Sequence, residues 1–298
     1  MGLTKEEYQH YVQVLKDTGA HREAGKIEKV LPDYYLDYAN KVKREKVTVE
    51  VPSVKVPVCC YITTALDKEE NCPVHVNMHG GGFVYLQDED DDRYCARIAV
   101  EIRGIVVDID YASSYDHPYP VAFEQSYEVL KWTFAHAVEW GADPAKISMG
   151  GHSAGGCLVA ACAFRAAKTG DFQVNLMILD YAANDNYFVT QPPVQIRSDA
   201  FSMLYADGDV ELLKDPYVSP CFAEGEILKN LPKTVFVTPE NCPFAEKNDE
   251  LAMRMIKAGV EVTVKHYPAC RHGFTVRICD AWDDAQRFII KEIRDANA

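Results

Sequence analysis

Basic residues are scarce in this chain, and it contains no long apolar run. Lys and Arg total 31 against 45 Asp and Glu, so the formal net charge is −14. Nucleic acids and anionic membranes are bound through basic patches, and we therefore expect neither as a partner. No apolar stretch approaches the ~20 residues that cross a bilayer. The start of the sequence, Met1–Glu7, also lacks the basic and apolar regions of a signal peptide, so we expect a cytoplasmic protein.

The 10 cysteines form no C-x-x-C pair, although Cys59 and Cys60 are adjacent. Without a secretion signal we expect the thiols to stay reduced, and no ligand spacing points to a metal or another cofactor. Linkers, internal repeats and low-complexity tracts are also missing from the sequence. At 298 residues the chain is long enough for one large core, so we expect a single domain over residues 1–298.

Two glycine-containing segments carry the chemistry: H-G-G-G-F at residues 79–83 and G-H-S-A-G at residues 151–155. The second follows the apolar Ile147–Met149 and precedes small residues, which is the strand, sharp turn and helix that a nucleophile elbow requires. The glycines allow close backbone approach and a strained serine whose hydroxyl is exposed. The first segment supplies backbone N–H groups for an oxyanion. Together they predict a serine hydrolase with Ser153 as nucleophile.

Each segment alone has a plainer interpretation. G-x-S-x-G occurs by chance at helix N-termini, and three glycines also occur in ordinary loops or phosphate cradles. No G-K-[ST] follows the glycines here, and an acidic run, Asp88–Asp92, comes soon after them. That run is typical of a solvated loop with favourable charge at the start of a helix over Arg93–Ile102. The two motifs in this order, each behind a predicted strand, favour the hydrolase.

Strands and helices are expected to alternate along the chain. Val alternates with polar residues over Lys46–Tyr61, which indicates antiparallel edge strands. Core strands are predicted at Val74–Met78, Ile105–Ile109, Ile147–Met149, Leu176–Leu179, Val235–Thr238 and Val260–Val264. Helices are predicted at Ala122–Val138, Gly155–Ala167, Asp249–Lys257 and Trp282–Ile293. This order predicts an α/β fold, a mainly parallel sheet with helices on both faces and its site beyond the carboxyl ends of the strands.

From about Val74 onward the chain resembles the hormone-sensitive-lipase-like (family IV) carboxylesterases of the α/β-hydrolase superfamily. Besides the two motifs, the matching segments are Asp110–Pro120, Gly141–Ile147, Asp215–Pro220 and His272–Phe274. The resemblance implies an α/β-hydrolase fold with a small helical cap, and hydrolysis of short acyl esters without a cofactor. It further implies Ser153 as nucleophile, His272 as general base and an oxyanion hole of the Gly81, Gly82 and Ala154 amides. His79 is then expected to orient the glycine loop, and His152, where the family often has Asp, to be a scaffold residue.

The chain departs from the family at the catalytic acid, whose position is occupied by Cys242. The acid of a Ser-His-Asp triad fixes the tautomer of the imidazole and stabilises the imidazolium, and its loss elsewhere lowers turnover by about 10⁴. Three accounts compete. Another carboxylate has taken over, with Glu246 favoured and Glu240 or Asp185 as alternatives; Cys242 pairs with His272 as a thiolate; or the protein is weakened or non-hydrolytic.

Two regions are expected to contribute to a cap over the site. Residues 1–45 carry an apolar stripe and a second aromatic group, with members Tyr8, Tyr11, Val12, Val14, Leu15, Tyr34, Tyr35, Leu36 and Tyr38. Residues 185–225 carry further large apolar side chains: Tyr187, Phe188, Phe201, Met203, Leu204 and Tyr205. Such side chains suit an apolar acyl or alcohol group, and they equally suit packing of the cap on the core.

The function expected from the sequence is hydrolysis of a small-molecule ester of short to medium acyl length. One alternative is a ligand-binding protein, such as a receptor, on a hydrolase scaffold. A receptor of this fold is expected to lack the catalytic histidine, but His272 is present here. Another is an amidase or a lyase that uses the same pocket. The composition leaves a homodimer open.

Overall fold

One central sheet organises the chain in the computed structural model, which describes all residues except 1–5, 8, 11, 14–29 and 188–195. Its eight strands are β1 (Val42–Val49), β2 (Val58–Ala65), β3 (Cys72–Met78), β4 (Ile105–Asp110), β5 (Ala142–His152), β6 (Leu176–Asp180), β7 (Lys233–Asn241) and β8 (Val262–Arg271). They lie in the order β1-β2-β4-β3-β5-β6-β7-β8. The strand β2 runs antiparallel to β1 and β4, and all other pairs are parallel. The predicted mainly parallel sheet is confirmed.

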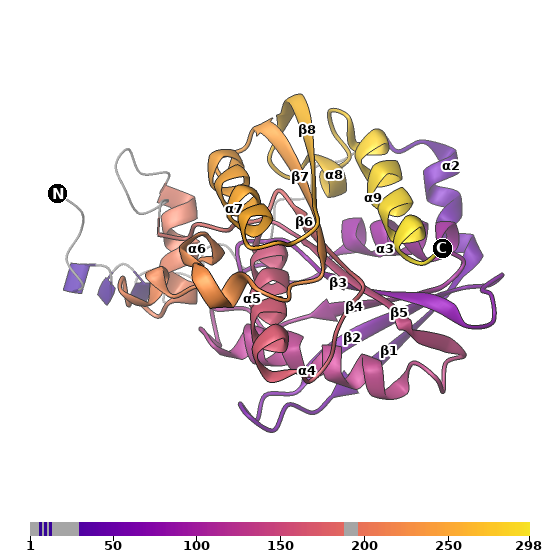
Figure 1. The fold of residues 1–298 in the computed structure, drawn as a ribbon, viewed down its shortest axis with the longest axis horizontal. Coiled ribbons are helices and arrows are strands. Elements are labelled where there is room, and N and C mark those ends of the chain that lie inside the picture. The colour runs from indigo at the N-terminus through magenta and orange to yellow at the C-terminus, as the bar shows by residue number, and fades with distance from the viewer. Residues whose placement is uncertain (1–5, 8, 11, 14–29, 188–195) are drawn as a thin grey trace.

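Helices cover both faces of this sheet (Figure 1). The helices on one face are α4 (Val121–His136), α5 (Ala154–Thr169) and α7 (Ala245–Lys257); those on the other are α3 (Glu89–Glu101), α8 (Phe274–Arg277) and α9 (Trp282–Ala296). Side chains of a strand alternate between the two faces. In β6, Met177 and Leu179 join the core under α5, whereas Leu176 and Ile178 join the core under α3 and α9. None of the described helices is both long and apolar enough to cross a membrane.

The sequence located every core strand, but the predicted bounds were too short both for the central β5, expected over Ile147–Met149, and for the edge strand β8. Strand β8 was expected over Val260–Val264, but it extends from Val262 to Arg271. Its apolar pattern ends at Val264 because β8 has a neighbour on one side only, and most of its later residues are exposed. Buried runs reveal a strand in the interior of a sheet, whereas an exposed edge strand lacks that signal.

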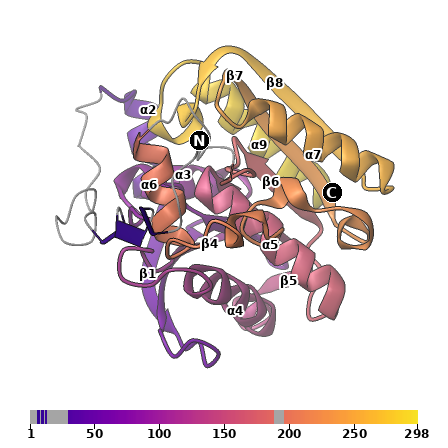
Figure 2. The same cartoon turned by 90° about the vertical axis from the view of Figure 1, so that its left-hand side faces the viewer.

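The two expected cap regions behave differently. The short helix α6 (Ile196–Tyr205) lies on the same side of the molecule as the described part of the N-terminal segment (Figure 2). There Val12 is buried and Gln9 lies against Gly208. The stripe residues Tyr8, Tyr11, Val14 and Leu15, and also Phe188 of the second region, lie outside the described residues.

The second aromatic group does not join that region. It lies in α2 (Asp33–Leu36) and in the following turn of 3-10 helix, η1 (Asp37–Lys41). Tyr35 is buried edge-on against Trp282 of α9, with ring centroids 4.9 Å apart. The Tyr38 hydroxyl donates to Glu101 of α3 at 2.5 Å. These contacts belong to the packing of the outer helices, so the assignment of this group to the cap is corrected.

Candidate active site

Ser153 lies at a sharp turn between β5 and α5. Its backbone has φ 56° and ψ −118°, a conformation that costs a non-glycine residue on the order of 1–3 kcal/mol. The turn requires glycine at 155, because a Cβ there would lie 1.9 Å from the Met78 carbonyl oxygen. The Ser153 N–H donates to the Asp180 carbonyl at 3.0 Å, and the Ala183 N–H donates to the Ser153 carbonyl at 2.8 Å. The fold therefore holds the strained serine from both sides.

The glycine loop follows β3 and lies beside this turn. A Cβ on Gly80 would lie 3.5 Å from the Ser153 Cβ. Gly81 and Gly82 have φ values of 120° and 65°, which L side chains rarely adopt. Their N–H groups, and that of Ala154 at the start of α5, have no acceptor among the described residues. Three donors are thus available close to the serine, as an oxyanion hole requires.

His272 directly follows β8 and bridges the serine to Cys242. Its Nε2 lies 2.9 Å from the Ser153 Oγ, and its Nδ1 lies 3.1 Å from the Cys242 Sγ. Cys242 directly follows β7, so the three residues meet where three parallel strands end. Burial lowers the pKa of His272 to about 3 and raises the pKa of the Cys242 thiol to about 12. Both groups are therefore neutral at pH 7, and a thiolate–imidazolium pair is disfavoured.

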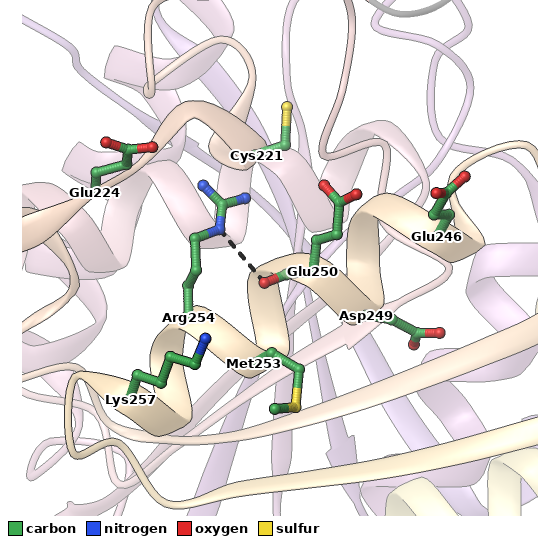
Figure 3. A pocket seen from close by; sticks show the side chains of 8 residues that line it. All are labelled: Cys221, Glu224, Glu246, Asp249, Glu250, Met253, Arg254 and Lys257. Atoms are coloured by element: carbon green, nitrogen blue, oxygen red, sulfur yellow. Dashed lines mark hydrogen bonds between the residues drawn. The ribbon is translucent and has the colours of Figure 1, made fainter.

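Two of the carboxylates expected as relocated acids, Glu246 and Glu240, make other contacts. Glu246 is exposed in the first turn of α7 and lines a surface pocket of about 850 Å³ together with Glu224 and Asp249 (Figure 3). The Glu240 carboxylate accepts from the Ala269 N–H at 2.7 Å. The hydrogen-bond partner of His272 Nδ1 among the described residues is Cys242. Glu246 makes no such contact, because it lies in the first turn of α7 with its side chain exposed.

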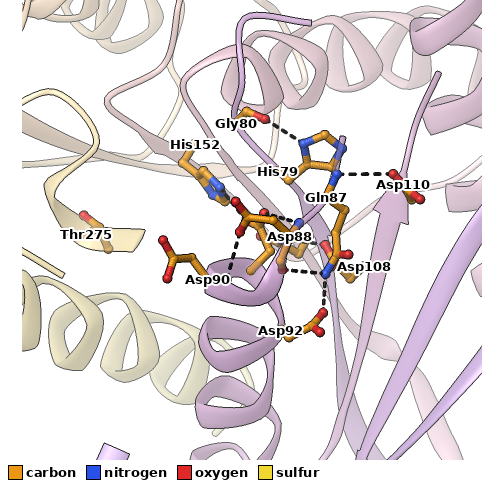
Figure 4. A network of polar contacts seen from close by, with 12 residues as sticks. His79, Gly80, Gln87, Asp88, Asp90, Asp92, Asp108, Asp110, His152 and Thr275 are labelled. Atoms are coloured by element: carbon orange, nitrogen blue, oxygen red, sulfur yellow. Dashed lines mark hydrogen bonds and ion pairs between the residues drawn. The ribbon is translucent and has the colours of Figure 1, made fainter. Parts of the chain in front are cut away.

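A buried polar pair lies behind Ser153. His152 Nε2 is 2.9 Å from the Asp91 Oδ1. Figure 4 shows His152 beside the N-terminus of α3, where Asp88 and Asp90 lie. Burial raises the pKa of Asp91 to about 7 and lowers the pKa of His152 to about 3. The acidic run was expected to be solvated; for Asp91 this is wrong, because the helix turns its side chain inward toward β5. The favourable charge at a helix start is confirmed, but the expected bounds are wrong: α3 begins at Glu89 and not at Arg93, so the run lies in its first turn, which Asp88 caps through the Asp90 N–H.

His79 lies under the glycine loop. Its ring stacks on Tyr111 with centroids 4.1 Å apart, and its Nδ1 lies 2.6 Å from the Gly80 carbonyl oxygen. The Tyr111 hydroxyl donates to the His79 carbonyl at 2.7 Å. Burial lowers the pKa of His79, so the ring is neutral. These contacts fix the start of the loop, in keeping with an orienting role.

The sequence did not single out Asp91 or Asp180 as residues of this region. A carboxylate inside an acidic run gives no signal of its burial, although alternation along β6 would have placed Asp180 on an inner face of the sheet. Among the described residues, no group of three or more His, Cys, Asp or Glu side chains is arranged to hold a metal ion.

An elbow serine, a glycine loop and a histidine at the carboxyl ends of this sheet define an α/β hydrolase. The family model for the alpha/beta hydrolase fold matches residues 75–276. Esterase LipI of Mycobacterium tuberculosis is 28% identical over 237 residues, which span 76% of this chain and 73% of that protein. Carboxylesterase NlhH of the same organism is 29% identical over 218 residues, 69% of this chain and 67% of that protein.

Solved structures are also similar. The esterase of Pyrobaculum calidifontis superposes with a TM-score of 0.77 at 25% identity, over 98% of this chain and 91% of its own. Brefeldin A esterase, described as a bacterial homologue of human hormone-sensitive lipase, shares the fold with a TM-score of 0.79 at 19% identity, over 98% of this chain and 86% of its own. The chain therefore belongs to the α/β-hydrolase family, and its esterase relatives identify it as a carboxylic ester hydrolase.

Proposed function

We propose that the protein hydrolyses short- to medium-chain acyl esters through an acyl-enzyme on Ser153. The observation that carries the proposal is the 2.9 Å contact between the Ser153 Oγ and the His272 Nε2, beside three N–H groups that lack an acceptor among the described residues. A nucleophile and a base within hydrogen-bonding reach are the geometry of nucleophilic catalysis.

The reaction follows from this arrangement. The Ser153 Oγ attacks the ester carbonyl while His272 Nε2 takes the hydroxyl proton. The carbonyl oxygen becomes an oxyanion that accepts hydrogen bonds from the Gly81, Gly82 and Ala154 amides, each worth about 3 kcal/mol. The C–O bond then breaks, and the alcohol leaves with the proton from His272. Water attacks the acyl-enzyme by the same route and releases the acid.

Cys242 takes the acid's place in this proposal as a neutral hydrogen-bond partner. The productive tautomer carries its proton on Nδ1 and donates it to Sγ, which leaves Nε2 free to accept from Ser153. In the other tautomer the thiol donates to Nδ1 and Nε2 is blocked. A thiol is both a weak donor and a weak acceptor, so it selects less strongly between the two than a carboxylate. We therefore expect an active esterase whose turnover is lower than that of a full triad.

The cap in this proposal consists of α6 and the N-terminal segment, within a single domain over residues 1–298. A Cβ on Gly82 would lie 2.2 Å from the Phe201 ring, so this ring of α6 rests on the oxyanion loop. Phe201 also packs edge-on against Tyr85 at 5.5 Å, and Tyr205 stacks on Phe83 at 3.8 Å. An aromatic wall this close to the reacting carbon favours a compact acyl group.

The test is hydrolysis of p-nitrophenyl esters from acetate to octanoate by the wild type and by Ser153→Ala. We expect turnover that depends on Ser153 and declines toward the longer chains. Equal rates for both proteins across the whole series would refute the proposal. A matched control is Ser148→Ala, which removes a buried serine hydroxyl of the same strand that contacts His75.

A further inference from the structure

Asp180 is a buried carboxyl group beside the catalytic residues that the reaction above does not use. It ends β6, and its side chain is 1% exposed. Its backbone carbonyl accepts from the Ser153 N–H at 3.0 Å. Its Oδ1 accepts from the Thr275 hydroxyl at 3.2 Å, three residues after His272. Asp180 thus contacts both the nucleophile's turn and the segment that carries the base.

One of the two oxygens of this carboxyl group lacks a hydrogen-bond partner among the described residues. The Oδ2 of Asp180 is buried and has no hydrogen bond among the described residues. A buried polar atom without a partner costs about 1–3 kcal/mol, so the fold alone does not account for an acid here. Such groups are concentrated at functional sites.

The position of Asp180 suits the missing acid. Strand β6 pairs with β7 so that Asp180 lies opposite Val237, and β7 runs on from there to Cys242, which directly follows it. Burial is the main cause of the raised pKa of Cys242, and the charge of Asp180 adds to it. The Asp180 carbonyl accepts from the Ser153 N–H at 3.0 Å, and the Ser153 Oγ lies 2.9 Å from the His272 Nε2, so a single residue separates Asp180 from the base.

We propose that Asp180 is an electrostatic positioning residue for the esterase: in its ionised form it stabilises the His272 imidazolium and its productive tautomer from the end of β6. This inference rests on the proposed function. Asp180 does not touch the substrate, and no proton passes from it to His272. Its contribution is the field of one negative charge in a dry region, where such a field is strong.

The charge state of Asp180 then controls the rate. Burial raises the pKa of Asp180 well above its usual range, so the ionised form grows as the pH rises. The groups around it are the Cys242 thiol, the phenols of Tyr94, Tyr181 and Tyr267, the pair of His152 with Asp91, and the more distant Arg277. Arg277 is the one permanent cation in this set, and it is exposed. The kcat of the wild type should therefore increase toward higher pH.

The experiment compares Asp180→Asn with the wild type in p-nitrophenyl acetate hydrolysis from pH 5.5 to 9, with the Ser153→Ala rate subtracted. We expect kcat to fall by about tenfold or more at alkaline pH, KM to stay the same, and the alkaline increase to disappear. The matched control is Asp108→Asn in β4, also 1% exposed, with Oδ1 held by Asn77 at 2.7 Å and a buried Oδ2 without a partner in the described chain. It should keep the wild-type profile.

Two further variants keep the test decisive if Asp180→Asn folds poorly. Thr275→Val removes the donor to Oδ1 and should move the alkaline increase to higher pH, because the ionised form loses a hydrogen bond. In a Cys242→Asp background, Asp180→Asn should lower kcat less than twofold, since the charge is already supplied. An Asp180→Asn profile equal to that of Asp108→Asn would overturn the inference alone. Absence of Ser153-dependent turnover in the wild type would overturn the proposed function, and the inference with it.

Discussion

Replacing Cys242 by aspartate should make the enzyme faster. The substitution puts a carboxylate where a neutral thiol now lies 3.1 Å from the His272 Nδ1. A negative charge about 4 Å from the imidazolium is worth about 4 kcal/mol at an effective dielectric constant of ~20. Desolvation of the buried carboxylate opposes this gain. We expect about 2 kcal/mol to remain, which corresponds to a rise in kcat of about 30-fold.

The same charge should change the pH profile. The pKa of His272 is lowered to about 3 in the wild type, chiefly by burial. A neighbouring carboxylate favours the protonated ring and should raise this pKa by roughly 1–2 units. The base must be neutral to act, so the acidic limb of kcat/KM moves to higher pH in the variant.

The assay is p-nitrophenyl acetate hydrolysis from pH 4 to 8, with Cys242→Asn as control. Asparagine has the shape of aspartate without its charge, so it should give no rise in kcat over the wild type. A Cys242→Asp variant no faster than Cys242→Asn, with an unmoved acidic limb, would refute the placement of Cys242 at the acid position.

Three further predictions follow from the packing of the site. Gly82→Ala should lower kcat/KM by about 100-fold in ester hydrolysis. The alanine Cβ would lie 2.2 Å from the Phe201 ring, and the backbone φ of 65° is one that L side chains rarely adopt. Unchanged kinetics would argue against this loop as the oxyanion hole. Phe201→Ala should shift the preferred acyl chain toward octanoate in the same series, and an unchanged preference would remove α6 from the acyl pocket. Asp91→Asn should unfold at a Tm about 2–6 °C lower in thermal denaturation, since His152 loses a buried ionisable partner; an unchanged Tm would mean that the pair contributes nothing. Because burial raises the pKa of Asp91 to about 7, its contribution to stability is present below the unfolded pKa and is lost as the pH rises from about 4 to 7. The difference in Tm between wild type and Asp91→Asn should shrink over that range, and a difference that grows would contradict the direction of this pKa shift.

Much of the fold could be predicted because its signals are local. Apolar runs bounded by turns located the inner strands, and the two glycine motifs placed the expected nucleophile and oxyanion loop at strand ends. The edge strand β8 was too short in the prediction because exposure removes the apolar pattern.

The acid could not be predicted, because the partner of His272 depends on tertiary geometry. Glu246 is four residues from Cys242 and looked like a substitute, but the helix that it begins leaves it exposed. Asp91 was expected to be solvated with the rest of the acidic run, but its side chain is buried against His152. Neither outcome is encoded in the residue type or in the spacing.

The most direct test of the central claim is intact-protein mass spectrometry after treatment with a fluorophosphonate, which reacts with an activated serine hydroxyl. The account predicts one adduct per chain on Ser153 in the wild type and in Cys242→Ala, slower labelling in Cys242→Ala, and no adduct in Ser153→Ala or His272→Ala. An adduct that persists in Ser153→Ala, or an unlabelled wild type, would contradict it.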